Sequence, residues 1–155
     1  MEDILPQGER GLSLRITPTE GEIATLLERI HEFADEAALP PALGYRLALA
    51  AEELAVNTLH HGAGAHFIAM RLRPSGDGWE LTVEDDGPAF DPLLQPEADT
   101  ESDLDDRAIG GLGLHLIRGF ARALRYERGD GRNRLTALFV AGPPPDARIA
   151  DGDSA

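Results

Sequence analysis

The sequence predicts one α/β domain, a two-layer sandwich in which about three helices cover one face of a mixed, mostly antiparallel sheet. Three observations predict it. Apolar residues alternate with polar ones along several short stretches, which is typical of half-buried strands. Along other stretches they recur every three or four positions, which is typical of helices. Glycine-rich turns join the strand-like stretches into two hairpins. A chain of 155 residues has room for one hydrophobic core of this kind.

The first elements predicted are a strand and a helix. Apolar and polar residues alternate over residues 12–17, which indicates a half-buried strand. Thr19 and Glu22 then have the spacing of a capping box, so a helix is expected to begin there. The residues that this helix is expected to bury follow the helical period: Ile23, Leu26, Leu27, Ile30, Ala34 and Ala37.

The second half of the chain predicts two hairpins and a third helix. Alternation over residues 66–72 and 79–85 indicates two strands, and the turn residues at 74–78 join them into a hairpin. Periodic apolar residues over 116–124 indicate an amphipathic helix. The second hairpin is expected around the glycine-containing turn at residues 129–131.

The compact domain is expected to span residues 11–141, between a flexible N-terminal segment at residues 1–10 and a disordered tail at residues 142–155. Inside the domain, an acidic segment at about residues 93–110 shows neither a helical nor a strand period. A structureless run of this length within a compact domain is often a functional lid. We therefore expect a lid there.

The composition excludes several classes of protein and site. The formal net charge is -14, which argues against direct binding to nucleic acid or to an anionic membrane, because both need basic surface. The chain has no cysteine, so disulfides, cysteine-ligated zinc and a thiol nucleophile are excluded. Neither a signal peptide nor a membrane-spanning apolar run is recognisable, and we expect a cytoplasmic location.

A helix expected from Pro41 to Gly62 carries polar residues on one stripe. Glu53, Asn57 and His61 follow one another at i, i+4 and i+8, so they share a face of the helix. Asn supplies a neutral oxygen ligand suited to Mg²⁺, and Glu can accept a proton or orient a hydroxyl. A solvated helix face can carry the same residues without any function, and the helix alone leaves both interpretations open.

Asp85 is the last member of an apolar row on the strand that begins at Trp79. A buried carboxylate is costly unless it has a partner, and the exocyclic amino group of adenine is one such partner. The alternative is that Asp85 and Asp86 open a turn, as Asp often does. Gly87 would let a ligand approach the backbone closely.

A glycine-rich segment, Gly110-Gly111-Leu112-Gly113, is expected to precede the third helix. Glycines that lead into a helix leave free N–H groups at the positive end of the helix dipole, which is a natural cradle for phosphate. The alternative is a flexible hinge between the expected lid and the helix.

Three boxes stand in one order: Glu53-x-x-x-Asn57-x-x-x-His61-Gly62, Asp85-x-Gly87-x-Ala89-Phe90 and Gly111-x-Gly113-Leu114. Together they resemble the superfamily of gyrase, heat-shock chaperone, histidine-kinase and mismatch-repair ATPases, which share the Bergerat ATP-binding fold. Within it, residues 83–92 and 110–118 are similar to the anti-sigma-factor serine kinases of the sporulation and general-stress type. The resemblance extends from about residue 12 to residue 140.

The resemblance implies a role for each matched residue. Glu53 would be the general base that activates a serine hydroxyl of a protein substrate, Asn57 would ligate the Mg²⁺ that bridges the ATP phosphates, and Asp85 would bind adenine. The remaining nucleotide-binding positions that it implies are Gly87, Ala89, Gly111, Leu112, Gly113 and Leu114. The implied partners are an anti-anti-sigma (STAS-type) protein as substrate, a sigma factor, and a second copy of the chain in a homodimer.

Two departures from the family pattern leave the function of the protein open. Ala89 stands where many superfamily members have Gly, and we expect it to narrow the adenine pocket without closing it. The expected lid carries six acids and only Arg107, so charge repulsion disfavours its closure over a triphosphate. The first possibility is a serine kinase, and the second is a nucleotide-dependent anti-sigma module without kinase activity. A structural α/β domain with coincidental boxes is the third possibility.

Overall fold

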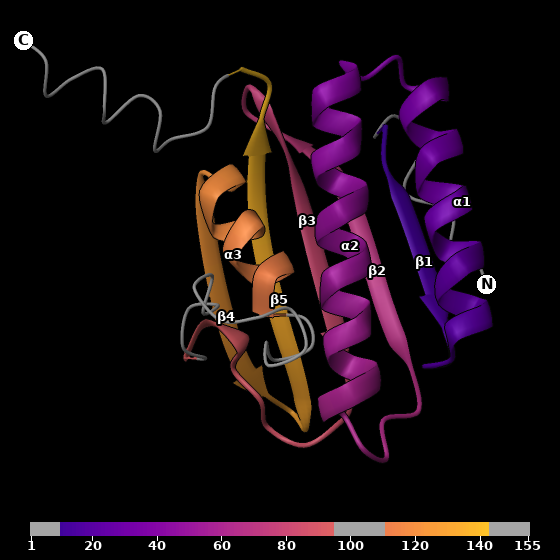
Figure 1. Ribbon diagram of the computed structural model, residues 1–155, viewed down its shortest axis with the longest axis vertical. Coiled ribbons are helices and arrows are strands. Elements are labelled where there is room, and N and C mark those ends of the chain that lie inside the picture. The colour runs from indigo at the N-terminus through magenta and orange to yellow at the C-terminus, as the bar shows by residue number, and fades with distance from the viewer. Residues whose placement is uncertain (1–9, 95–110, 143–155) are drawn as a thin grey trace, which may run out of the picture.

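Five strands form one sheet in the order β1-β2-β3-β5-β4, and three helices cover one of its faces (Figure 1). The structure, a computed structural model, describes residues 10–94 and 111–142, and these counts refer to that part of the chain. The predicted two-layer α/β sandwich is thus confirmed. The strands are β1 (Leu12–Ile16), β2 (Ile68–Ser75), β3 (Gly78–Asp85), β4 (Ala123–Gly129) and β5 (Arg132–Val140). The helices are α1 (Glu20–Glu36), α2 (Pro41–His61) and α3 (Gly111–Phe120), with a short 3₁₀ helix, η1 (Pro92–Leu94).

The sheet differs from the prediction in the direction of its strands. We expected a mixed sheet, but every pairing among the described strands is antiparallel. The connections explain this. Two-residue turns join β2 to β3 and β4 to β5, and such turns can link only antiparallel neighbours. The helices α1 and α2 run in opposite directions, so the chain enters β2 at the end opposite to its entry into β1 (Figure 1).

The start of α1 follows the predicted capping pattern with one change. Thr19 is the N-cap, and its hydroxyl oxygen accepts a hydrogen bond from the Glu22 backbone N–H at 3.2 Å. In a capping box the N3 side chain returns to the N-cap backbone. Here the Glu22 carboxylate instead accepts from the backbone N–H of Thr17, which lies two residues before the N-cap Thr19. The cap therefore also ties the helix to the end of β1.

The core lies between the helices and the covered face of the sheet. Ile23, Leu26 and Ile30 of α1 are buried as predicted, and Phe33, which the periodicity analysis omitted, is buried with them. The Phe33 ring packs in a T-shaped arrangement with the Trp79 ring of β3, with ring centroids 5.5 Å apart. Each fully buried side chain of this size contributes about 1.5–3 kcal/mol. Three predicted positions are only half-buried: Leu27, Ala34 and Ala37.

The helix α2 lies over the middle of the sheet, between α1 and α3 (Figure 1). It can approach the strands closely because many of its buried residues are small: Gly44, Ala48, Ala50, Ala51 and Ala55. Pro41 begins the helix and Gly62 caps its C-terminus, as the sequence predicted. This packing brings the C-terminal half of α2 over the ends of β3 and β5.

The boundary between α3 and β4 was predicted wrongly. We expected the helix to continue to Leu124, but α3 ends at Phe120 and Leu124 belongs to β4. The backbone N–H of Arg122 donates to the Leu138 carbonyl at 2.7 Å, so hydrogen bonds to β5 replace those of the helix. Sheet pairing with a distant segment thus overrode the local helical period. None of the helices within the described ranges is long and apolar enough to cross a membrane.

Candidate functional site

A pocket lies between the C-terminal half of α2 and the neighbouring ends of β3, β4 and β5. The space between its lining atoms totals about 420 Å³, part of it open to solvent. The polar side chains that line it come from four separate elements: Asn57, Thr58, His61, Asp85, Tyr126 and Asn133. The apolar part of the lining includes Leu54, Val83, Phe90 and Leu135. The structure therefore brings Asn57 and Asp85, which belong to two different sequence boxes, to one pocket.

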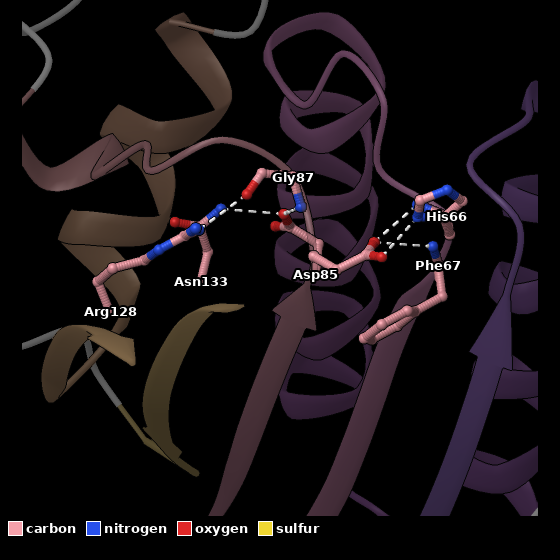
Figure 2. Close-up of polar contacts among 7 residues, drawn as sticks. His66, Phe67, Asp85, Gly87, Arg128 and Asn133 are labelled. Carbon is pink, nitrogen blue, oxygen red and sulfur yellow. Dashed lines mark hydrogen bonds and ion pairs between the residues drawn. The ribbon is translucent and has the colours of Figure 1, made fainter. Parts of the chain in front are cut away.

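Asp85 ends β3 on the helix-covered face and is 9% exposed. Its Oδ1 accepts hydrogen bonds from the Gly87 backbone N–H at 2.9 Å and from Asn133 Nδ2 at 3.0 Å (Figure 2). Its Oδ2 accepts from the Thr58 hydroxyl at 3.2 Å. These partners make burial of the carboxylate tolerable. The bond from Gly87 closes a turn, so Asp85 opens a turn, as one sequence interpretation expected, and it also lines the pocket.

Asn133 is the residue opposite Asp85 in the β3–β5 register. Its amide nitrogen also donates to the Pro88 carbonyl at 2.8 Å. Its amide oxygen accepts from the Phe90 backbone N–H at 3.1 Å and from the Tyr126 hydroxyl at 2.5 Å. Sequence reasoning missed this residue. The signal was an amide in the inward-facing row of β5, whose other members are apolar: Leu135, Ala137 and Phe139.

Gly87 and Ala89 do not line the pocket. Gly87 is buried, and its carbonyl accepts a hydrogen bond from Arg128 Nη1 at 2.8 Å (Figure 2). A Cβ at this position would lie 3.1 Å from Gly62 Cα, so a larger residue would crowd the end of α2, against which the loop after β3 packs. Ala89 is exposed. The expected narrowing of the pocket by Ala89 is therefore not found, because its side chain lies outside the lining.

Glu53 lies on α2 one turn before Asn57, but it is not among the residues that line the pocket. It is half-buried, and its Oε2 is buried without a hydrogen-bond partner in the described part of the chain. Burial, with a smaller contribution from the negative charge of Glu52, raises the pKa of the Glu53 carboxyl. An unpartnered carboxylate with a raised pKa has the chemistry of a proton acceptor.

Asn57 fits a role as a cation ligand. Its side chain lines the pocket and makes no hydrogen bond within the described residues, so its amide oxygen is available. A neutral oxygen is a ligand type that Mg²⁺ accepts, together with phosphate oxygens. Within residues 10–94 and 111–142, no group of three or more His, Asp or Glu side chains could hold a metal ion.

The third sequence box begins α3 instead of preceding it. Gly111 is the first residue of the helix, so Leu112 and Gly113 lie in its first turn, and Leu114 is buried. The expected lid lies outside the described residues from position 95 onward. Of the ends expected to be flexible, at residues 1–10 and 142–155, all but residues 10 and 142 also lie outside them. Arg118 Nη2 donates to the Leu93 carbonyl at 2.6 Å and joins α3 to η1 at the edge of the pocket.

Two further contacts shape the surroundings of the pocket. The His61 and Phe90 rings, which both line it, are stacked with centroids 4.6 Å apart and planes 10° from parallel. Asp86 accepts from the His66 and Phe67 backbone N–H groups at 2.7 and 3.2 Å and contacts His66 Nδ1 at 2.8 Å. Burial opposes ionisation of Asp86, but these hydrogen bonds outweigh it and lower its pKa to about 2. Asp86 thereby anchors the start of β2 beside the loop that follows Asp85.

Comparison with known proteins assigns the family. Residues 16–139 match the histidine kinase-like ATPase domain. The chain belongs to this family. The match includes all three sequence boxes, so the resemblance to the Bergerat-fold ATPases is confirmed, and the chain is an ATP-binding, kinase-like enzyme.

Two similar proteins carry kinase names. The serine/threonine-protein kinase BtrW of Bordetella bronchiseptica is 36% identical over 104 residues, which cover 65% of this chain and 73% of the relative. The histidine kinase domain from the Erythrobacter litoralis EL346 blue-light activated histidine kinase is 21% identical, with a TM-score of 0.45 over 76% of this chain. This chain covers 60% of that structure.

Proposed function

We propose that this protein is an ATP-binding anti-sigma factor with serine kinase activity, which transfers the γ-phosphate of ATP to a serine of an anti-anti-sigma protein. The observation that carries the proposal is the meeting of Asn57 and Asp85 in one pocket beneath α2. Similarity to a protein named a serine/threonine-protein kinase supports serine as the acceptor. A sigma factor is the second proposed partner, and the protein would act as a homodimer in the cytoplasm.

The residues divide the chemistry between them. Asp85 would bind the base, and Asn57 would hold Mg²⁺, which neutralises charge on the phosphates. The Glu53 carboxylate would accept the proton of the substrate serine. As it does so, the serine oxygen forms a bond to the γ-phosphorus, and the bond from that phosphorus to the β–γ bridging oxygen breaks, which releases ADP. Most of the rate enhancement would come from positioning.

The second candidate is an anti-sigma module that uses nucleotide only to set its conformation. One observation favours it: Glu53 does not line the pocket that contains Asn57 and Asp85. The two candidates differ in one measurement. Incubation with γ-labelled ATP, Mg²⁺ and an anti-anti-sigma protein labels a serine if the protein is a kinase. The binding module would hold both ligands and transfer no label.

Glu53→Gln tests the general base. Without the carboxylate, transfer should fall by about 10²–10⁴-fold, while ATP affinity by calorimetry stays within about threefold. Because the variant also removes a partly buried charge that lacks a partner, its melting temperature should rise. The matched control is Glu52→Gln, which changes the exposed neighbouring acid and should leave transfer intact. Full transfer by Glu53→Gln would remove this residue from the mechanism.

A further inference from the structure

We infer that Asn133 is a positioning residue for base recognition: it holds Asp85 so that one carboxylate oxygen remains available to a ligand, which makes the pocket selective for a base with an exocyclic amino group. The inference rests on the proposed nucleotide-binding function and adds a residue to it that no sequence box contains. It comes from the hydrogen bonds around the Asp85–Asn133 pair.

The two oxygens of Asp85 are occupied unequally. Oδ1 accepts from two N–H donors, Gly87 at 2.9 Å and Asn133 at 3.0 Å. Oδ2 has the Thr58 hydroxyl at 3.2 Å, and this hydroxyl also lies 3.3 Å from the Leu54 carbonyl. A hydroxyl has one proton to donate, so it cannot satisfy both acceptors at once. Oδ2 is therefore the oxygen with capacity for a donor from a ligand.

The orientation of the Asn133 amide is set by its other partners. Its oxygen faces two donors, the Phe90 backbone N–H and the Tyr126 hydroxyl, while its nitrogen faces two acceptors, Asp85 Oδ1 and the Pro88 carbonyl. A flipped amide would place donors against donors and acceptors against acceptors. The network thus permits one orientation, in which Asn133 donates to Asp85. Since Asn133 is only 6% exposed, water cannot readily replace these partners.

This arrangement predicts which bases the pocket prefers. Asn133, Gly87 and Thr58 hold Asp85 with neutral donors, and within residues 10–94 and 111–142 no positive side chain forms an ion pair with its carboxylate. An amino group can donate to Oδ2, whereas a carbonyl oxygen at the same place would meet the carboxylate as a second acceptor and be repelled. The pocket should therefore favour adenine over a base that carries an oxygen at that position.

The test compares ATP with purine riboside 5′-triphosphate, which lacks only the exocyclic amino group. Affinities for both are measured by calorimetry on the full chain and on two variants, Asn133→Ala and Tyr126→Phe. The wild-type protein should bind ATP at least about tenfold more tightly, because a hydrogen bond to a charged group is lost with the analogue. The ratio should fall to within about threefold in Asn133→Ala. It should fall partway in Tyr126→Phe, which keeps the aromatic ring and removes the hydroxyl that orients Asn133.

The ratio separates positioning from a merely structural role. A loosened pocket would weaken both nucleotides equally and keep the ratio, and that result would overturn the inference. A wild-type protein that does not distinguish the two nucleotides would also overturn it. Binding of neither nucleotide would instead refute the proposed function. The exposed Tyr45→Phe is the matched control and should keep the wild-type ratio. If Asn133→Ala does not fold, Tyr126→Phe decides.

Discussion

Two adjacent rungs of the β3–β5 ladder place similar acids in opposite environments. Glu84 and Asp85 are consecutive, so their side chains lie on opposite faces of the sheet, with Asp85 on the helix-covered face. Across the ladder, Glu84 is opposite Arg134 and Asp85 is opposite Asn133. Glu84 contacts the guanidinium groups of Arg132 and Arg134 at 2.9 and 2.8 Å. Asp85 contacts only neutral donors among the described residues.

The difference shows how one sheet separates a structural face from a functional one. On the open face, the countercharges of the two arginines compensate Glu84, and their side chains remain about half exposed. Such pairs contribute little, because water would solvate the same groups in the unfolded chain. On the covered face, neutral donors hold Asp85 in position and leave its charge uncompensated. That charge is available to a ligand. The buried carboxylate is tolerated only while every hydrogen bond from these neutral donors is made.

The largest effect is expected from removal of the buried acid. Asp85→Ala should lower the free energy of unfolding by about 3 kcal/mol, because the Gly87 N–H and one of the two N–H groups of the Asn133 amide lose their buried acceptor. Glu84→Ala, the matched change on the neighbouring rung, should cost less than about 1 kcal/mol. Urea unfolding of both variants measures the two values. Equal losses would mean that the two faces do not differ in the way described.

The third consecutive acid sharpens the comparison through its pH dependence. The hydrogen bonds to Asp86 lower its pKa from 3.8 to about 2. A depressed carboxyl pKa stabilises the fold above the unfolded value and loses this effect as the pH falls through the folded one. Asp86→Asn should therefore lower the unfolding free energy at neutral pH by at most about 2 kcal/mol.

The difference between wild type and Asp86→Asn should shrink between about pH 4 and pH 2. Unfolding of both proteins in urea at a series of pH values measures it. A difference that stays constant over this range would show that the hydrogen bonds from His66 and Phe67 do not depend on the Asp86 charge.

The smallest effect is expected for the exposed pair itself. A double-mutant cycle with Glu84→Ala and Arg134→Ala should give a coupling energy of about 0.2–1 kcal/mol, because Glu84 also contacts Arg132 and the arginines are half exposed. The coupling should decrease as salt is added. A coupling that is large and insensitive to salt would contradict the assignment of this face as a solvated surface.

Local patterns predicted the elements that depend on nearby residues. The Thr19 cap, the Pro41 start and Gly62 end of α2, and the position of Asp85 at the end of an apolar row all follow from spacings of a few residues. The same reasoning failed at Leu124, where pairing with β5 replaced the helical period. Motif position also did not place Gly87 and Ala89 in the lining of the pocket, and their predicted contact with nucleotide stays a prediction.

The amino-acid sequence by itself determined the two-layer architecture and the three boxes, because periodicity and motif spacing are properties of neighbouring positions. Only the tertiary structure decided that Thr58 and Asn133 hydrogen-bond to Asp85, and that the Tyr126 hydroxyl in turn bonds to Asn133. It also decided that Glu53 stands outside the pocket that contains Asn57. The physical reason is the register of β3 against β5. The packing of distant side chains sets this register, and it places an amide opposite a carboxylate that lies far from it along the chain.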